Sequence, residues 1–276
     1  MMPKKNKGEK METVGKEMFE YVNSQLDKIE EKYGIEILYC VEAGSRGWGF
    51  SNEDSDYDIR FIFKRPLNDY FSINTKKDTI DYINGDLDFV GWDIKKALHL
   101  HWKSNPNLKE WTKQKIIYRG DCKFLDNLPA FSPVTLKYHY GSLAYNNWKR
   151  YVVGKDNKMT KKVTKRYMYA IRCILTWILI DEGKDAPIEI DELMKCFIND
   201  DRMGTRLYAD ILMLISYYRS NCQKSKPDER AIENVTTFIN AYIEIMKADK
   251  PKMEELSEIE IYNKRFREIV LEYLEV

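Results

Sequence analysis

Three acidic residues and one Gly-Ser pair have the residue types and the spacing that a catalytic or ligand-binding site could use. Gly44-Ser45 comes directly after the apolar run IEILYCVEA, which is typical of a strand. Asp56 and Asp58 lie at the start of the next such run, YDIRFIF, and Asp88 lies between two apolar residues of a later one, LDF. Each feature is common alone, so the chemistry depends on whether the fold brings them together.

Carboxylates gathered on one sheet face would form a site for divalent cations. Alternate strand residues share a face, so we expect Asp56 and Asp58 to point the same way, about 6.6 Å apart. Asp88 is costly to bury without a partner. Three such carboxylates can hold two cations roughly 4 Å apart, which clamp the attacking and leaving oxygens of a phosphoryl transfer. Mg²⁺ suits this role because it prefers oxygen ligands and keeps substrate phosphates in its shell.

The Gly-Ser turn has the properties of a phosphate-binding loop. Glycine lets the backbone come close to a ligand, and a serine hydroxyl with exposed N–H groups can hold phosphate oxygens. Arg46 follows directly. Its guanidinium would either reach the β- and γ-phosphates or face solvent as a loop cation, and the residues leave both interpretations open.

Two further acids have competing interpretations. If Asn84-Gly85 forms a two-residue hairpin, Asp81 pairs across from Asp88 and adds a fourth carboxylate, but a register slip would remove it. Asp93 precedes an apolar-periodic segment and is predicted to cap a helix rather than bind metal, because it lies on the opposite strand face from Asp88.

The elements that must position these residues change in type along the chain. Up to about residue 130, short strand signals alternate with helical ones; beyond it, helical periodicity dominates. The predicted class is therefore α+β, a small mixed sheet with helices followed by a helical domain. We assign residues 1–10 to a disordered tail, 11–130 to the sheet domain and 131–276 to the helical domain. The strands are expected at 35–42, 57–64, 78–83, 86–92 and 115–120.

Charge is balanced in total but sorted along the chain. The 276 residues carry 45 Lys+Arg and 44 Asp+Glu, a net charge of +1, which excludes an overall basic nucleic-acid coat. Residues 78–93 nevertheless carry −5 and residues 148–172 carry +8. Within the basic segment, Lys165, Tyr169 and Arg172 fall on one helix face. Such a face suits a triphosphate or an RNA backbone, although a solvated helix face next to a lysine-rich loop has the same composition.

Other classes of protein are disfavoured. No run approaches the roughly 20 apolar residues of a membrane span, and the basic start lacks the apolar stretch of a secretory signal. Five scattered cysteines and three histidines give no zinc-ligand spacing, and His99 and His101 are expected on a helix surface. We expect a cytoplasmic protein with reduced thiols and no membrane association.

Taken in order, the motifs resemble the polymerase-β nucleotidyltransferase superfamily. Gly-Ser, ten intervening residues, Asp-x-Asp and a later apolar-Asp-apolar strand follow one another. The similarity is stronger still to the YcgL-like, RNA-repair-associated (RlaP) group, over roughly residues 38–120 and again at 165–172. The segments that carry it are GSRGWGF, SDYDIRFIF, DLDFVGWDIKKAL, SNPNLKEW, IIY and KRYMYAIR.

The resemblance implies an enzyme that moves a nucleoside monophosphate from an NTP, such as ATP, to an acceptor hydroxyl and releases pyrophosphate. It implies that Asp56, Asp58 and Asp88 are catalytic and bind Mg²⁺ or Mn²⁺. It also implies that Gly44 and Ser45 hold the triphosphate and that Lys165 and Arg172 contact the nucleotide. Arg46 is a further candidate for nucleotide binding because of its position directly after Gly-Ser.

Three hypotheses about function follow. The acceptor is RNA in a repair setting, reached through residues 148–172, or it is a small molecule or a protein side chain. Alternatively, the protein is a non-catalytic module that binds nucleotide or RNA, against which the intact Asp56, Asp58 and Asp88 argue. The sequence leaves open the preferred NTP, the acceptor and the oligomeric state.

Overall fold

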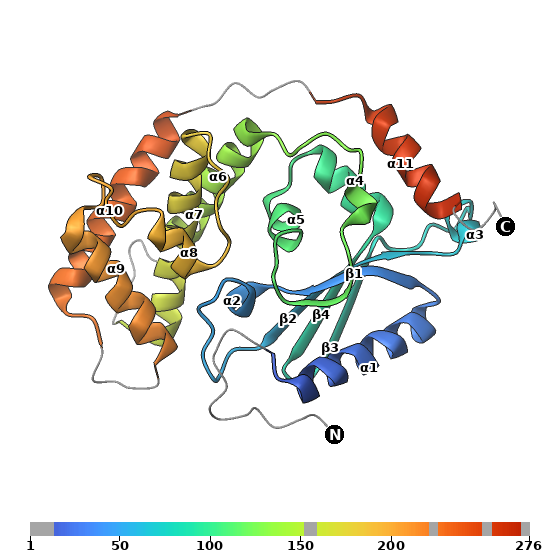
Figure 1. Ribbon diagram of the computed structural model, residues 1–276, viewed down its shortest axis with the longest axis horizontal. Coiled ribbons are helices and arrows are strands. Elements are labelled where there is room, and N and C mark those ends of the chain that lie inside the picture. The colour runs from blue at the N-terminus through green and yellow to red at the C-terminus, as the bar shows by residue number, and fades with distance from the viewer. Residues whose placement is uncertain (1–13, 152–158, 221–225, 250–255, 272–276) are drawn as a thin grey trace. The chain divides into compact units, whose positions relative to one another are not determined.

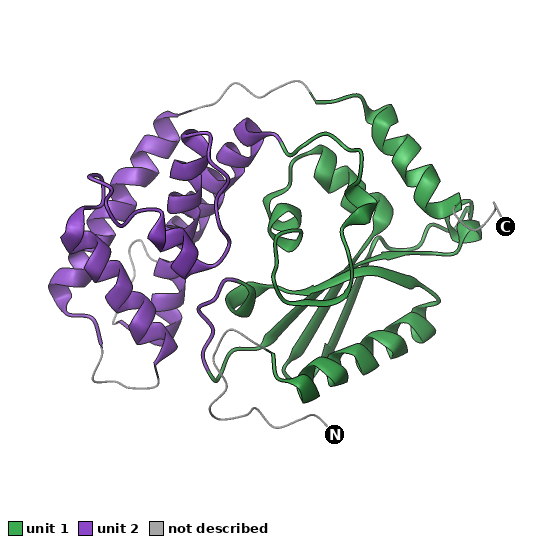
Figure 2. Ribbon diagram, viewed as in Figure 1, with its two compact units in different colours: residues 1–47, 53–131, 255–276 green, residues 48–52, 132–254 purple. Residues whose placement is uncertain are grey.

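The computed structural model describes residues 14–151, 159–220, 226–249 and 256–271. The chain divides into two compact units (Figure 2). Unit 1 comprises residues 1–47, 53–131 and 255–276, and unit 2 comprises residues 48–52 and 132–254. A five-stranded sheet together with many helices confirms the predicted α+β class.

Unit 1 is built on a mixed sheet whose strand order is β3-β4-β2-β1-β5. Its central pair, β2 and β4, is parallel, and the other neighbours are antiparallel. In a parallel pair, both strands begin at the same end of the sheet. Acids near those beginnings therefore become neighbours. The strands are β1 (Glu36–Glu42), β2 (Tyr57–Lys64), β3 (Thr79–Asn84), β4 (Leu87–Asp93) and β5 (Ile117–Gly120).

Helices cover both faces of this sheet, as Figure 1 shows for α1 on one side and α4 and α5 on the other. Alternation along β2 explains the two layers: Ile59 and Phe61 pack in the core that includes α1 residues, and Ile62 packs in the core that includes α4 residues. The helices of unit 1 are α1 (Lys16–Tyr33), α2 (Gly44–Gly47), α3 (Leu67–Tyr70), α4 (Ile94–Trp102), α5 (Pro106–Trp111) and α11 (Ile259–Leu271), with a 3-10 turn at Lys123–Leu125.

The C-terminal helix α11 belongs to unit 1, whereas the sequence had assigned it to the helical domain. It packs against α4: His101 Nδ1 and the Tyr262 hydroxyl are 3.1 Å apart, and Trp102 Nε1 donates to the Ser257 carbonyl at 2.8 Å. His101 is therefore buried, not on the surface as expected, and burial lowers its pKa to about 4. Helical periodicity identifies an apolar face but not the surface that this face covers.

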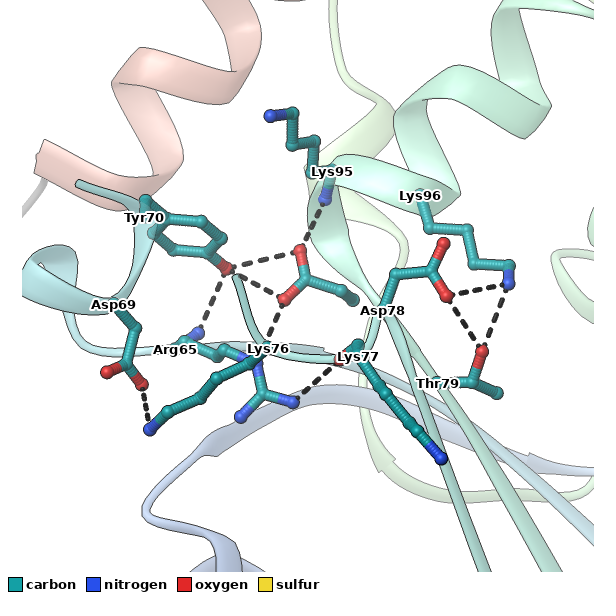
Figure 3. A network of polar contacts seen from close by, with 10 residues as sticks. Arg65, Asp69, Tyr70, Lys76, Lys77, Asp78, Thr79, Lys95 and Lys96 are labelled. Carbon is teal, nitrogen blue, oxygen red and sulfur yellow. Dashed lines mark hydrogen bonds and ion pairs between the residues drawn. The ribbon is translucent and has the colours of Figure 1, made fainter. Parts of the chain in front are cut away.

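A polar network fixes the junction between β4 and α4 (Figure 3). Asp93 caps α4 as predicted, because its carboxylate accepts from Lys95 N at 2.9 Å. The Tyr70 hydroxyl lies 3.3 Å from both Asp93 oxygens, and Arg65 Nε lies 3.5 Å from one of them. This network anchors the ends of β2 and β4 that are opposite to Asp58 and Asp88.

Unit 2 is helical, with α7 as its most buried helix. The loop 48–52 belongs to this unit: Trp48 and Phe50 contact the Tyr169 ring, Ile190 N donates to the Trp48 carbonyl, and Arg219 donates to the Gly49 carbonyl. In the described ranges, no helix combines the length and apolarity needed to cross a membrane. The helices are α6 (Pro133–Tyr151), α7 (Lys161–Asp181), α8 (Ile190–Lys195), α9 (Gly204–Arg219) and α10 (Glu229–Ala248).

Candidate active site

Asp58 and Asp88 lie side by side near the beginnings of β2 and β4. They are directly paired residues of the parallel strands β2 and β4. The Arg60 side chain lies between them, and its Nη2 is 2.9 Å from Asp58 Oδ1 and 2.9 Å from Asp88 Oδ2. The two carboxylate side chains are 26% and 39% exposed, so they are partly desolvated yet accessible. The structure thus brings together two of the three acids that the sequence singled out.

Asp56 stands apart from this pair. It precedes β2, is exposed, and its carbonyl accepts from Arg46 Nε at 3.3 Å. Strand alternation, which predicted that Asp56 shares a face with Asp58, applies only from Tyr57 onward, because β2 begins there. Among the residues that the structure describes, no three His, Cys, Asp or Glu side chains are grouped so that they could hold a metal ion.

The Gly-Ser turn lies against Asp58. Gly44 has φ of +58°, and a Cβ at this position would be only 1.8 Å from Asp58 Oδ2. The Ala43 N–H donates to the Asp58 carbonyl at 2.8 Å, which ties the turn to β2. Ser45 is 1% exposed, and its Oγ has no hydrogen-bond partner within the described structure. A buried hydroxyl without a partner, in a turn that lies against Asp58, has the chemistry to donate to a phosphate oxygen.

Arg46 clamps the connection that follows the turn. Its Nη2 donates to the Ser55 carbonyl at 2.9 Å, and its guanidinium carbon lies 4.0 Å from the centre of the Tyr57 ring. The sequence interpretations considered a phosphate contact or a solvent-facing cation. The structure shows a third role. Arg46 lies at the start of the segment between α2 and β2, and it contacts the end of that segment at Ser55 and Asp56.

Glu42 is a site residue that sequence reasoning missed. It is fully buried at the end of β1 and accepts from the Asp58 N–H at 2.9 Å and from the Tyr118 hydroxyl at 2.7 Å. Burial raises the pKa of Glu42 to about 7. The available signal was an acid that follows five consecutive apolar residues, ILYCV, directly before Ala43-Gly44. Glu42 therefore holds the backbone of Asp58 from the opposite face of the sheet.

The predicted nucleotide contacts on α7 lie in unit 2. Arg172 is only 5% exposed, and its guanidinium carbon lies 4.1 Å from the centre of the Trp48 ring. Tyr169 meets Trp48 edge-on with ring centres 5.2 Å apart, and Lys165 Nζ lies 5.9 Å from the centre of the Tyr169 ring. This face of α7 thus packs on the loop that follows the Gly-Ser turn. Part of the basic segment, residues 152–158, lies outside the described residues.

Asp81 does not pair with Asp88. The β3–β4 register places Asp81 opposite Val90 and Asp88 opposite Ile83, because Asn84 pairs with Leu87 and the turn is formed by Gly85 and Asp86. The hairpin was predicted, but its turn is one residue further along the chain. Asp81 is exposed and contributes no fourth carboxylate opposite Asp88.

Comparison with known families decides the relationship that these motifs suggested. The model of RlaP, the RNA repair pathway DNA polymerase beta family, matches residues 18–268. The chain belongs to this family. The RlaP match extends over nearly all described residues of both units, and it confirms the resemblance drawn from the motifs.

This RlaP-family chain is also similar to a curated bacterial protein over most of its length. It is 35% identical over 241 residues to the uncharacterized protein YcgL of Bacillus subtilis (strain 168), which covers 84% of the chain and 88% of the relative. A solved nucleotidyltransferase-like protein from Exiguobacterium sibiricum 255-15 is 11% identical, with a TM-score of 0.36 and coverage of 92% and 89%. At that level of similarity, the solved structure constrains neither the fold nor the activity.

Proposed function

We propose that this RlaP-family protein is a nucleotidyltransferase that depends on a divalent metal and acts on RNA. The observation that carries the proposal is the pairing of Asp58 with Asp88, together with the close approach of Gly44 to Asp58. These residues fit a metal–nucleotide complex, because they combine oxygen ligands with a glycine turn and a buried serine hydroxyl. Asp58 and Asp88 would hold Mg²⁺ or Mn²⁺, and Asp56 would join them from the adjoining loop.

The proposed reaction is a substitution at the α-phosphorus of an NTP. The acceptor hydroxyl oxygen forms a bond to this phosphorus, and the bond to the oxygen bridging the α- and β-phosphates breaks. Pyrophosphate leaves with the electron pair, and the Asp88 carboxylate takes the hydroxyl proton. A bound divalent metal neutralises charge that develops on the phosphate oxygens.

Residues of the turn and of α7 supply the proposed nucleotide contacts. Gly44 lets the triphosphate approach the backbone, and the Ser45 hydroxyl donates to a phosphate oxygen. Lys165 is a proposed nucleotide contact because of its positive charge on α7. Arg172 acts through Trp48, because its guanidinium is buried against that ring. Arg46 acts through the loop that it clamps.

Two observations support an RNA acceptor. The family description places its members in RNA repair. The segment 148–172 carries a net charge of +8, which suits a phosphate backbone. A small hydroxylated molecule or a protein side chain would use the same chemistry, and the experiment below separates these acceptors.

The test is transfer of label from each α-³²P-NTP, with Mg²⁺ or Mn²⁺, to pools of RNA, protein or small molecules. We expect label on RNA, and we expect it to disappear in Asp58→Asn and Asp88→Asn. Asp81→Asn is the matched control, because this exposed acid lies on the neighbouring strand opposite Val90 and should leave transfer intact. Full transfer by both site variants would refute the active-site assignment. Transfer to the other pools alone would refute the RNA acceptor.

A further inference from the structure

We propose that Arg60 is a positioning residue that holds Asp58 and Asp88 as a pair of metal ligands. The proposal rests on the nucleotidyltransferase function proposed above. Arg60 is neither an acid nor part of the Gly-Ser turn, yet its guanidinium contacts both carboxylates. It lies two residues beyond Asp58 on β2 and therefore on the same sheet face.

The guanidinium is anchored to backbone as well as to carboxylates. Its Nη1 donates to the Asp88 carbonyl at 2.7 Å and to the Ile59 carbonyl at 3.1 Å, while its Nη2 donates to one oxygen of each acid. The Arg60 side chain is 16% exposed, so solvent competes little for these bonds. A planar fork held at four points cannot turn without breaking several hydrogen bonds. Arg60 thus ties both strands to one fixed geometry.

This arrangement assigns different tasks to the two oxygens of Asp58. Arg60 contacts Oδ1, while Oδ2 is the atom that faces Gly44. Two carboxylates on adjacent strands repel each other, and the positive charge between them offsets that repulsion. Arg60 therefore restrains each carboxylate through one oxygen and directs the second oxygen of Asp58 toward the turn proposed to carry the triphosphate.

Removal of Arg60 has two opposite effects on metal binding. It takes away a positive charge that repels a divalent cation, which favours metal binding, and it releases the two carboxylates, which disfavours it. Outer hydrogen bonds to metal ligands typically contribute 10–100-fold in affinity, so we expect the loss of positioning to dominate. The sign of the change in metal affinity therefore distinguishes the two roles. Weaker binding indicates a positioning residue, and tighter binding indicates a cation that merely occupies the metal's place.

The experiment is a Mn²⁺ titration of the full chain, with free Mn²⁺ followed by electron paramagnetic resonance. We expect Arg60→Met to weaken Mn²⁺ binding by roughly 10–100-fold. Arg119→Met is the matched control, because Arg119 also joins two acids of unit 1, Asp27 at 2.6 Å and Glu30 at 2.8 Å. It should lower the thermal midpoint and leave Mn²⁺ affinity unchanged. Unchanged or tighter Mn²⁺ binding by Arg60→Met would overturn the proposal.

Two more variants keep the test decisive. If Arg60→Met does not fold, Arg60→Lys replaces it, because an ammonium keeps the charge but lacks the planar fork; weaker Mn²⁺ binding supports the proposal, and wild-type or tighter binding refutes it. Asp88→Asn tests the metal site itself. Wild-type Mn²⁺ affinity in Asp88→Asn would refute the proposed function. Loss of binding in Asp88→Asn with wild-type affinity in Arg60→Met would refute the Arg60 proposal alone.

Discussion

Replacing Gly44 by alanine should disable the protein by moving Asp58. The new Cβ would lie 1.8 Å from Asp58 Oδ2, and ordinary van der Waals contact begins at 3.4 Å. The carboxylate oxygen must therefore move by about 1.6 Å, the difference of these two distances. Because both oxygens belong to one carboxylate, a shift of that size also displaces Oδ1, which Arg60 contacts at 2.9 Å. Because a misplacement of about 1 Å can cost roughly 100-fold in rate, we expect nucleotide transfer to fall at least that much.

The left-handed backbone adds a separate effect that a control can remove. Gly44 has φ of +58°, and a residue with a Cβ in that region costs roughly 1–2 kcal/mol. Gly34→Ala is matched in this respect, because Gly34 has φ of +60° and no atom within 4 Å of a new Cβ. The free energy of unfolding from urea titrations should fall by about 1–2 kcal/mol in Gly34→Ala, with transfer at the wild-type rate.

The comparison of the two variants tests whether the close approach of Gly44 to Asp58 is needed for transfer. We expect Gly44→Ala to be less stable than Gly34→Ala, since it carries the steric clash in addition to the backbone strain. Transfer rates are measured at saturating NTP and metal on protein shown to be folded by circular dichroism. If Gly44→Ala transfers nucleotide as fast as Gly34→Ala, the close approach of the turn to Asp58 is not part of the site.

Four more predictions concern pH and the α7 face. Glu42 has its pKa raised from 4.5 to about 7 by burial, so folded protein holds a proton that the unfolded chain releases. The free energy of unfolding should fall as pH rises from about 4.5 to 7, by up to roughly 3 kcal/mol, and Glu42→Gln should remove this slope in urea titrations. His101 has its pKa lowered from 6.5 to about 4 by burial, so stability should be lost as pH falls through that window, and His101→Phe should abolish that loss. Lys165→Ala should raise the KM for NTP roughly tenfold, which corresponds to the loss of one charged contact, with little change in thermal midpoint. Arg172→Leu should also lower the midpoint, because it removes the guanidinium from the Trp48 ring. A double-mutant cycle with Trp48→Leu should give about 1–2 kcal/mol of coupling in urea titrations. Additive effects of the two substitutions would show that the ring contact is unimportant.

Local interactions made the helix and strand assignments predictable. Asp93 caps the helix that follows it, and apolar alternation along β2 places Asp58 on the face opposite Ile59. Such signals depend on residues within a few positions of one another. The same locality explains why the motifs pointed to Gly44, Asp58 and their chemistry before any contact was known.

Contacts between distant residues were decided only by the tertiary structure. Arg60 meets Asp88 across 28 residues of sequence, and Glu42 meets Tyr118 across 76. Neither contact follows from residue type, because each requires the pairing of particular strands in a particular register. The same holds for Asp81, which a turn one residue further along the chain places opposite Val90. The sequence by itself determined which residues could do chemistry, and the sheet register, which is set by packing over the whole unit, decided which of them meet.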